Sequence, residues 1–164
     1  MPAVSNSTPL IYLASLGDLD LIRHLFGRIL MPHAVYDEVV TNGSGKQGAD
    51  LVREAAKSWL DVVFVGNHRR VETLVQSGLD LGEAETIALA QETAESFILM
   101  DDRSAIEEAR AAGLDVVRTA AFYVIAKQHR LVPRVQPKLD ALRGAGFWLS
   151  DAHYRAILKL AAEA

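Results

Sequence analysis

The chain has 164 residues, which is enough for one ordinary domain with a sizeable apolar core. It holds 17 basic and 21 acidic side chains, and this mildly acidic balance argues against a protein that coats nucleic acid along its whole surface. There is no cysteine, which excludes disulfides, thiolate zinc sites and cysteine nucleophiles. No apolar run approaches the roughly 20 residues that span a bilayer, and the N-terminus does not read as a signal peptide. We therefore expect a cytoplasmic protein that does not associate with membranes.

Short apolar stretches alternate with helical patterns along most of the chain. Strands are expected at residues 1–5, 28–31, 62–65, 97–100 and 115–117. Helices are expected at residues 9–16, 19–26, 32–41, 49–60, 68–76, 83–94, 104–112, 120–128, 133–142 and 151–162.

The strands are apolar on both faces, which is typical of a parallel sheet covered by helices on each side. This pattern predicts a single three-layer α/β/α domain over residues 1–164. Its α/β core is expected to span residues 1–119, followed by a helical C-terminal extension over residues 120–164.

Two of the expected helices have capping signals at their N-termini. Thr8 is a plausible N-cap because Pro9 then occupies the first helical position. Ser104 and Glu107 have the spacing of a capping box. These signals predict that the corresponding helices begin at residues 9 and 104.

The strongest functional signal lies where the fourth strand ends. Four apolar residues run directly into Asp101 and Asp102, and a helical pattern follows them. In open α/β sheets, ligands bind at the C-terminal ends of the strands. Two adjacent carboxylates repel each other, and a cation or a helix N-terminus offsets that repulsion. The pair therefore predicts a ligand site, although Asp102 is equally suited to cap the following helix.

Further oxygen-bearing side chains occur where they could join Asp101. Asn6 ends the first strand, Glu38 lies on the third helix, and Glu83 and Glu85 lie in the first turn of the helix over residues 83–94. A set made only of oxygen ligands selects Mg²⁺ or Mn²⁺ rather than zinc. Phosphoryl transfer is the chemistry that requires such a site, because a divalent ion activates a water and holds the phosphodiester.

Each of these residues also has a purely structural interpretation. Asn6 is a favourable turn residue, and Glu38 in isolation would be an ordinary exposed acid on a helix. One of Glu83 and Glu85 is expected to serve only as a favourable charge at a helix N-terminus.

Six stretches in a fixed order resemble one known superfamily. They are residues 4–11, 32–39, 82–90, 98–105, 114–119 and 146–151. Together they cover nearly the whole chain and resemble the PIN-domain superfamily, the ribonuclease fold of VapC-type toxins. The closest similarity is to a prokaryotic PIN-like branch of predicted nucleic-acid-binding proteins.

The resemblance implies a PIN-like fold whose five-stranded parallel sheet has the strand order 3-2-1-4-5. Asn6 and Asp101 would then face each other across the crevice between the first and fourth strands. The superfamily usually has aspartate in place of Asn6, so this chain supplies a neutral amide oxygen there.

The resemblance also implies roles for individual residues. Glu38, Glu85 and Asp101 match the catalytic acids. The metal ligands would come from Asn6, Glu38, Glu83, Glu85, Asp101 and Asp102. Substrate contacts are expected from Ser7, Thr8, Arg103 and Thr119. Thr119 could hydrogen-bond a site carboxylate or a phosphate, or simply cap the next helix.

These roles predict a ribonuclease that depends on Mg²⁺ or Mn²⁺ and hydrolyses phosphodiester bonds in RNA. The resemblance further implies a homodimer, and a toxin paired with a small antitoxin protein. The alternative is a PIN-like module that binds nucleic acid or a protein without cutting, because Asn6 brings no negative charge.

The C-terminal third contains basic and aromatic side chains whose role the sequence leaves open. Its basic residues favour ordinary solvated helix faces slightly over a track for a phosphate backbone. Trp148, Phe147 and Tyr154 are expected to form core or dimer contacts rather than a platform for stacking bases.

Overall fold

The computed structural model describes residues 2–95 and 97–164, so Met1 of the first expected strand lies outside the described residues. The strands are β1 (Ala3–Ser5), β2 (Ile29–Pro32), β3 (Leu60–Val63), β4 (Phe97–Leu99) and β5 (Asp115–Val117). They form one sheet in the order β3-β2-β1-β4-β5, and every pair of neighbours is parallel. The implied strand order is therefore confirmed.

Every expected helix is present; those over residues 19–26 and 68–76 have the expected ends, the one over 32–41 is divided into two, and the others have shifted ends. The helices are α1 (Ser7–Ser15), α2 (Leu19–Phe26), α3 (His33–Tyr36), the π-helix η1 (Asp37–Thr41), α4 (Ala49–Ala55), α5 (His68–Gln76), α6 (Leu81–Glu92), α7 (Arg103–Ala111), α8 (Thr119–Gln128), α9 (Gln136–Gly144) and α10 (Asp151–Leu160). Among the described residues, none of these helices has the length and apolar character needed to cross a membrane.

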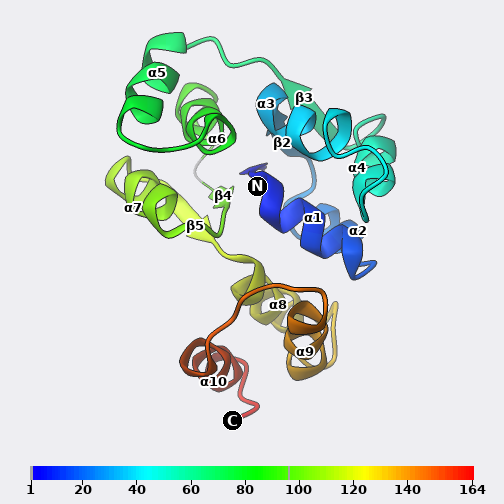
Figure 1. Cartoon of the computed structure of the whole chain (residues 1–164). Coiled ribbons are helices and arrows are strands. Elements are labelled where there is room, and N and C mark those ends of the chain that lie inside the picture. The colour runs from blue at the N-terminus through cyan, green and yellow to red at the C-terminus, as the bar shows by residue number, and fades with distance from the viewer. Residues whose placement is uncertain (1, 96) are drawn as a thin grey trace.

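Successive residues of each strand pack on opposite faces of the sheet. Ala3 and Leu99 belong to a buried cluster with residues of α1, α2, α4 and α8. Val4 and Ile98 belong to a second cluster with residues of α5, α6 and α7. Because helices cover both faces (Figure 1), the strands are apolar at most positions, as the sequence predicted, and Ser5, Asp61 and Asp115 are their polar residues.

The C-terminal helices share the first of these clusters. Leu139 of α9 and Leu158 of α10 are buried in it together with Phe122 of α8. Helix α8 contacts α1, α9 and α10, so it connects the sheet layers to the end of the chain. Figure 1 shows the three helices gathered beyond β5 and α1.

The predicted start of the first helix is wrong. Thr8 does not cap α1, which already begins at Ser7 with Asn6 in the N-cap position. The helix follows β1 without an intervening turn, so the residue directly after the strand becomes the cap.

The predicted capping box at the start of α7 is also wrong. Asp102 is the N-cap, and its Oδ1 accepts a hydrogen bond from the Ala105 N–H at 3.0 Å. An aspartate caps at least as well as a serine, and its charge is favourable at a helix N-terminus. Ser104 therefore lies inside the first turn.

Candidate metal centre

Asn6 lies where β1 ends and α1 begins, at the C-terminal edge of the sheet. Its N–H donates to the Leu99 carbonyl of β4 at 3.0 Å, which fixes its backbone beside that strand. An N-cap asparagine usually accepts a helix N–H with its side chain, but Asn6 makes no such bond. Its Oδ1 is buried and has no hydrogen-bond partner among residues 2–95 and 97–164.

Gly82 shows what the Asn6 oxygen faces. A Cβ at Gly82 would lie 3.5 Å from Asn6 Oδ1 and 3.2 Å from Glu38 Oε2. The two oxygens, from β1–α1 and from η1, therefore converge on the space that a side chain at this position of α6 would fill. Leaving a buried carbonyl oxygen unpaired costs about 1–3 kcal/mol, and a cation in this space would remove that cost.

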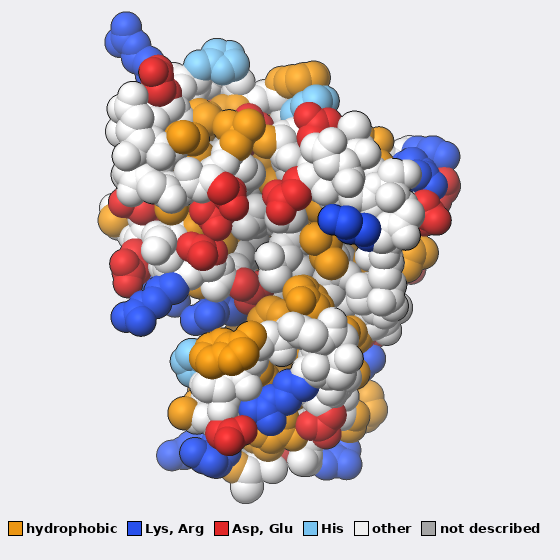
Figure 2. All heavy atoms as spheres, viewed as in Figure 1, with side chains coloured by type: hydrophobic (Ala, Val, Ile, Leu, Met, Phe, Trp, Pro, Cys, Tyr) orange, Lys and Arg blue, Asp and Glu red, His pale blue; other side chains and the backbone are white. Residues whose placement is uncertain are grey.

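Glu38 reaches this point from a π-helical segment. The wide turn of η1 is closed by a hydrogen bond of 2.7 Å from the Asn42 N–H to the Asp37 carbonyl. Such turns are rare and occur often at functional sites. Glu38 lines an open hollow with Asp37, Lys46 and Asp80, and Figure 2 shows acidic side chains gathered around a hollow on this face.

Glu85 lies on α6 three residues after Gly82 and contacts α3. Its Oε1 accepts a hydrogen bond of 3.2 Å from the N–H of Ala34, in the first turn of α3. This bond holds α3 against α6 and thereby positions η1, which follows α3 directly. One carboxylate oxygen of Glu85 is therefore already engaged in holding α3 against α6.

Asp101 follows β4 and is held rigidly by one residue. Thr119 donates its N–H to Oδ1 at 2.9 Å and its hydroxyl to Oδ2 at 2.5 Å. Arg118 Nη2 donates to the backbone carbonyl of Asp101 at 3.3 Å. Burial raises the pKa of Asp101, and the Thr119 hydrogen bonds and the Arg118 charge offset this only in part. Of the three roles considered for Thr119, the structure shows the hydrogen bond to a site carboxylate.

Glu83 is engaged in a true capping box. Its Oε2 accepts from the Asp80 N–H at 3.0 Å, while Asp80 Oδ1 accepts from the Glu83 N–H at 2.8 Å. Burial raises the pKa of Glu83 to about 7; the Asp80 N–H opposes the rise, and the charges of Asp80 and Asp102 add to it. The Asp-x-x-Glu spacing was visible in the sequence and would have identified this cap.

The remaining residues predicted at the site differ in their exposure to solvent. Asp102 caps α7 and is exposed, while Ser7 and Thr8 form the first turn of α1, with Ser7 only 4% exposed. Arg103 is 91% exposed and pairs with Glu107 of its own helix at 3.5 Å. Arg103 is thus turned toward solvent rather than toward Asp101.

The donor set fits a hydrated hard cation. Within the described ranges, no three His, Cys, Asp or Glu side chains close around one point. Mg²⁺ keeps several waters and is held by one or two carboxylates, so the Asn6 amide oxygen and the Glu38 carboxylate meet its requirements with water completing the shell. Ser5 of β1 pairs with Leu99 of β4, so Asp101 lies at the same sheet edge.

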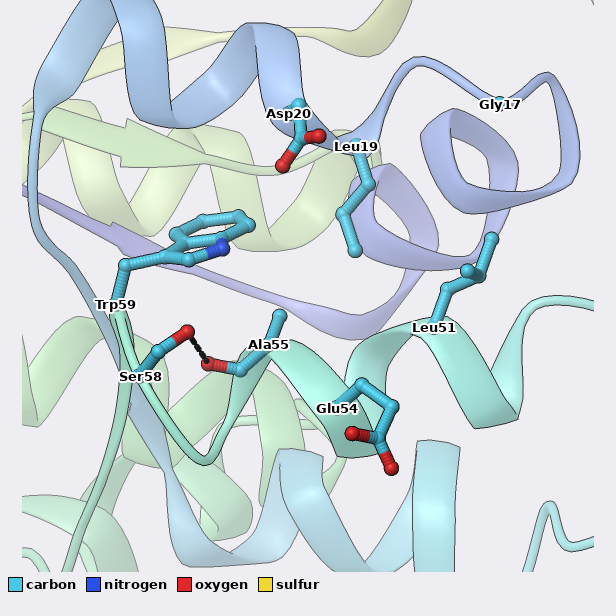
Figure 3. Close-up of a pocket in the computed structure, with 8 residues that line it drawn as sticks. All are labelled: Gly17, Leu19, Asp20, Leu51, Glu54, Ala55, Ser58 and Trp59. Atoms are coloured by element: carbon cyan, nitrogen blue, oxygen red, sulfur yellow. Dashed lines mark hydrogen bonds between the residues drawn. The ribbon is translucent and has the colours of Figure 1, made fainter.

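Another hollow, of about 290 Å³, lies between the start of α2 and α4. Leu19, Leu51 and Trp59 line it together with Asp20 and Glu54 (Figure 3). None of its lining residues belongs to the predicted metal set, so it is separate from the candidate centre.

Comparison with known proteins agrees with this geometry. A family model described as PIN domain matches residues 2–163, which is nearly the whole chain. No curated protein matches the sequence. The parallel sheet in the order 3-2-1-4-5 is consistent with the fold of that family. The chain therefore belongs to the PIN-domain family, which indicates a nuclease-like module.

Proposed function

We propose that this protein is a divalent-metal-dependent ribonuclease that hydrolyses RNA phosphodiester bonds. The observation that carries the proposal is the buried Asn6 Oδ1, which lacks a partner in the described chain and faces Glu38 Oε2 in the space beside Gly82. Bound there, Mg²⁺ or Mn²⁺ would supply an activated water and neutralise the charge that develops on the phosphate.

The residues around this point have distinct roles in the proposal. Asn6 and Glu38 hold the cation directly, and Glu85 keeps α3 against α6 so that Glu38 stays in place. Asp101 supplies a further carboxylate whose two oxygens are oriented by Thr119. Such preorganisation reduces the rearrangement needed as charge develops on the substrate.

Cleavage of single-stranded RNA in Mn²⁺ tests the proposal. Initial rates are compared for the wild type, Asp101→Asn, Glu38→Gln and the control Glu72→Gln, which changes an exposed acid on α5. Loss of one preorganised charged group should lower the rate about 100-fold or more, while the control keeps the wild-type rate. Equal rates in all four proteins would contradict the assignment of the site.

A second candidate function is nucleic-acid binding without cleavage. It is favoured by the neutral side chain of Asn6 and by the lack of a three-acid cluster in the described parts of the chain. Calorimetric titration with Mn²⁺ separates the two candidates, because only the nuclease requires saturable binding in the physiological range. The toxin role, the antitoxin partner and the homodimer stay predictions from the family resemblance.

A further inference from the structure

A groove of about 220 Å³ reaches Asp101 from the side of the C-terminal helices. Asp101 and Arg118 line it at the sheet, and Trp148 and Ile157 line it at the segment before α10 and on α10. This groove shares no lining residue with the hollow that Glu38 lines. Figure 2 shows hydrophobic, basic and acidic side chains close together where the sheet region meets the C-terminal helices.

Of the two roles that the sequence led us to expect for Trp148, a core contact or a dimer contact, its exposure excludes the core contact. It is 80% exposed, the highest value among the exposed large hydrophobic residues of the described chain. The residues on either side of it are anchored: Phe147 packs edge-on against Tyr12 with ring centroids 5.1 Å apart, and the Leu149 carbonyl accepts a hydrogen bond of 2.7 Å from Arg143. Trp148 is therefore held in solvent by a well-packed segment, not exposed by a loose one.

Arg118 gives the same groove a positive charge. Its guanidinium donates to the Asp101 backbone carbonyl at 3.3 Å and forms no ion pair within residues 2–95 and 97–164. A guanidinium that forms no close ion pair in a partly enclosed groove suits a phosphate, which it can bind through two parallel hydrogen bonds.

We propose that this groove is a nucleotide subsite, in which a base of single-stranded RNA stacks on Trp148 and its phosphate binds Arg118. This subsite rests on the proposed ribonuclease function, because it would present the neighbouring phosphodiester to Asp101. Exposed aromatic faces beside basic side chains are the usual means of holding unpaired bases.

The size of the groove favours one base over the other occupants. Its volume of about 220 Å³ is below the range of roughly 300–1,000 Å³ found for pockets that hold drug-sized ligands. A stable interface with a second copy of the chain would bury about 800 Å² on each partner and so would extend well beyond this groove. The positive charge of Arg118 beside a flat aromatic ring instead complements a nucleotide.

Binding in EDTA tests the subsite without any cleavage. The probe is a short single-stranded RNA titrated against Trp148 fluorescence in a Trp59→Phe background, because the chain has two tryptophans. Trp148→Ala, measured with a labelled form of the same RNA, should weaken binding about tenfold, and Trp148→Phe should recover most of that loss. The matched control is Leu160→Ala, which removes a 68% exposed apolar side chain of α10 outside the groove.

Two further probes separate stacking from simple charge attraction. An RNA with abasic positions should lose the dependence on Trp148 but keep the dependence on Arg118, which Arg118→Gln measures. A duplex RNA should bind equally to the wild type and to Trp148→Ala, because its bases are already stacked. Equal binding of single-stranded RNA to the wild type and Trp148→Ala would overturn the subsite.

The outcomes distinguish this inference from the proposed function. Trp148-dependent binding without cleavage by any variant supports the subsite and contradicts the nuclease. Metal-dependent cleavage with the same KM in the wild type and Trp148→Ala supports the nuclease and overturns the subsite. If light scattering shows that Trp148→Ala dissociates a dimer while RNA binding stays unchanged, the surface belongs to a second copy and the subsite is overturned.

Discussion

Partly buried carboxylates in two regions of this protein have very different surroundings. Near the C-terminus, Glu163 accepts hydrogen bonds from the Val135 N–H at 2.7 Å, the Gln136 N–H at 3.0 Å and Lys127 Nζ at 2.9 Å. We call this group the C-terminal clasp. At the C-terminal edge of the sheet, the carboxylate of Asp101 receives hydrogen bonds only from Thr119 within the described chain.

The pKa values of the two carboxyls move in opposite directions. Burial alone raises both. In the clasp, the hydrogen bonds from Val135, Lys127 and Gln136 outweigh burial and lower the pKa of Glu163 to about 2. At the sheet edge, the hydrogen bonds to Asp101 do not outweigh it, and its pKa stays raised.

The difference shows how one residue type can serve stability in one place and binding in another. A buried carboxylate whose charge is fully compensated holds its neighbours together. A carboxylate whose burial is compensated only in part leaves free energy to be gained when a cation arrives. The clasp therefore joins α8, α9 and the chain end, while the sheet edge keeps its capacity for a ligand.

The largest expected effect on stability comes from breaking the clasp. Glu163→Gln removes the charge that pairs with Lys127, so the free energy of unfolding should fall by about 2 kcal/mol. Urea unfolding monitored by circular dichroism measures this, with Glu72→Gln as a control expected to stay within about 0.5 kcal/mol of the wild type. An unchanged urea midpoint for Glu163→Gln would show that the clasp contributes nothing.

Lowering the pH should reduce the stabilisation from the clasp by nearly as much as Glu163→Gln does. The pKa of Glu163 is about 2 in the folded protein against an ordinary value of 4.5, so the unfolded chain takes up this proton first as the pH falls. The stabilisation is therefore complete above the ordinary pKa and is lost as the pH falls from there toward 2. The difference in unfolding free energy between the wild type and Glu163→Gln should shrink over this window, and a pH-independent difference would contradict the prediction.

Adding charge at the sheet edge should sharpen the contrast with the clasp. Asn6→Asp places a second carboxylate beside Glu38. The added negative charge should raise the Mn²⁺ affinity about tenfold, which corresponds to about 1.4 kcal/mol of binding free energy. Without metal, repulsion between the two carboxylates should lower the melting temperature, and saturating Mn²⁺ should restore it. Calorimetry and thermal unfolding measure the two effects, with Ser44→Asp in the loop after η1 as a control for added charge.

The smallest effect is expected at Glu83. Glu83→Gln keeps an oxygen that can accept from the Asp80 N–H but removes a charge close to Asp80 and Asp102. In mildly alkaline buffer the variant should be as stable as the wild type or more stable by less than about 1 kcal/mol, and its rate of RNA cleavage should be unchanged. A loss of cleavage as large as that expected for Asp101→Asn would contradict this prediction and indicate that Glu83 is a metal ligand.

Much of the fold was determined by the local pattern of the sequence. The apolar runs that became β4 and β5 were placed within one residue of their observed ends, because apolar residues fill all of β4 and the last two positions of β5. The strand order came from the family resemblance and is confirmed. The helix starts at Ser7 and Arg103 were missed because Asn6 and Asp102, in the short links after β1 and β4, occupy the N-cap positions, which periodicity does not reveal.

The tertiary structure decided which oxygen atoms meet and which side chains stay in solvent. Asn6, Glu38 and Gly82 are far apart in sequence and meet only because β1, η1 and α6 pack together, so no local spacing could show that their atoms lie within a few ångströms of one another. The exposure of Trp148 likewise depends on contacts that anchor its two neighbours. The sequence by itself determines the residue types and indicates where strands end, but the direction of each side chain depends on packing between distant segments.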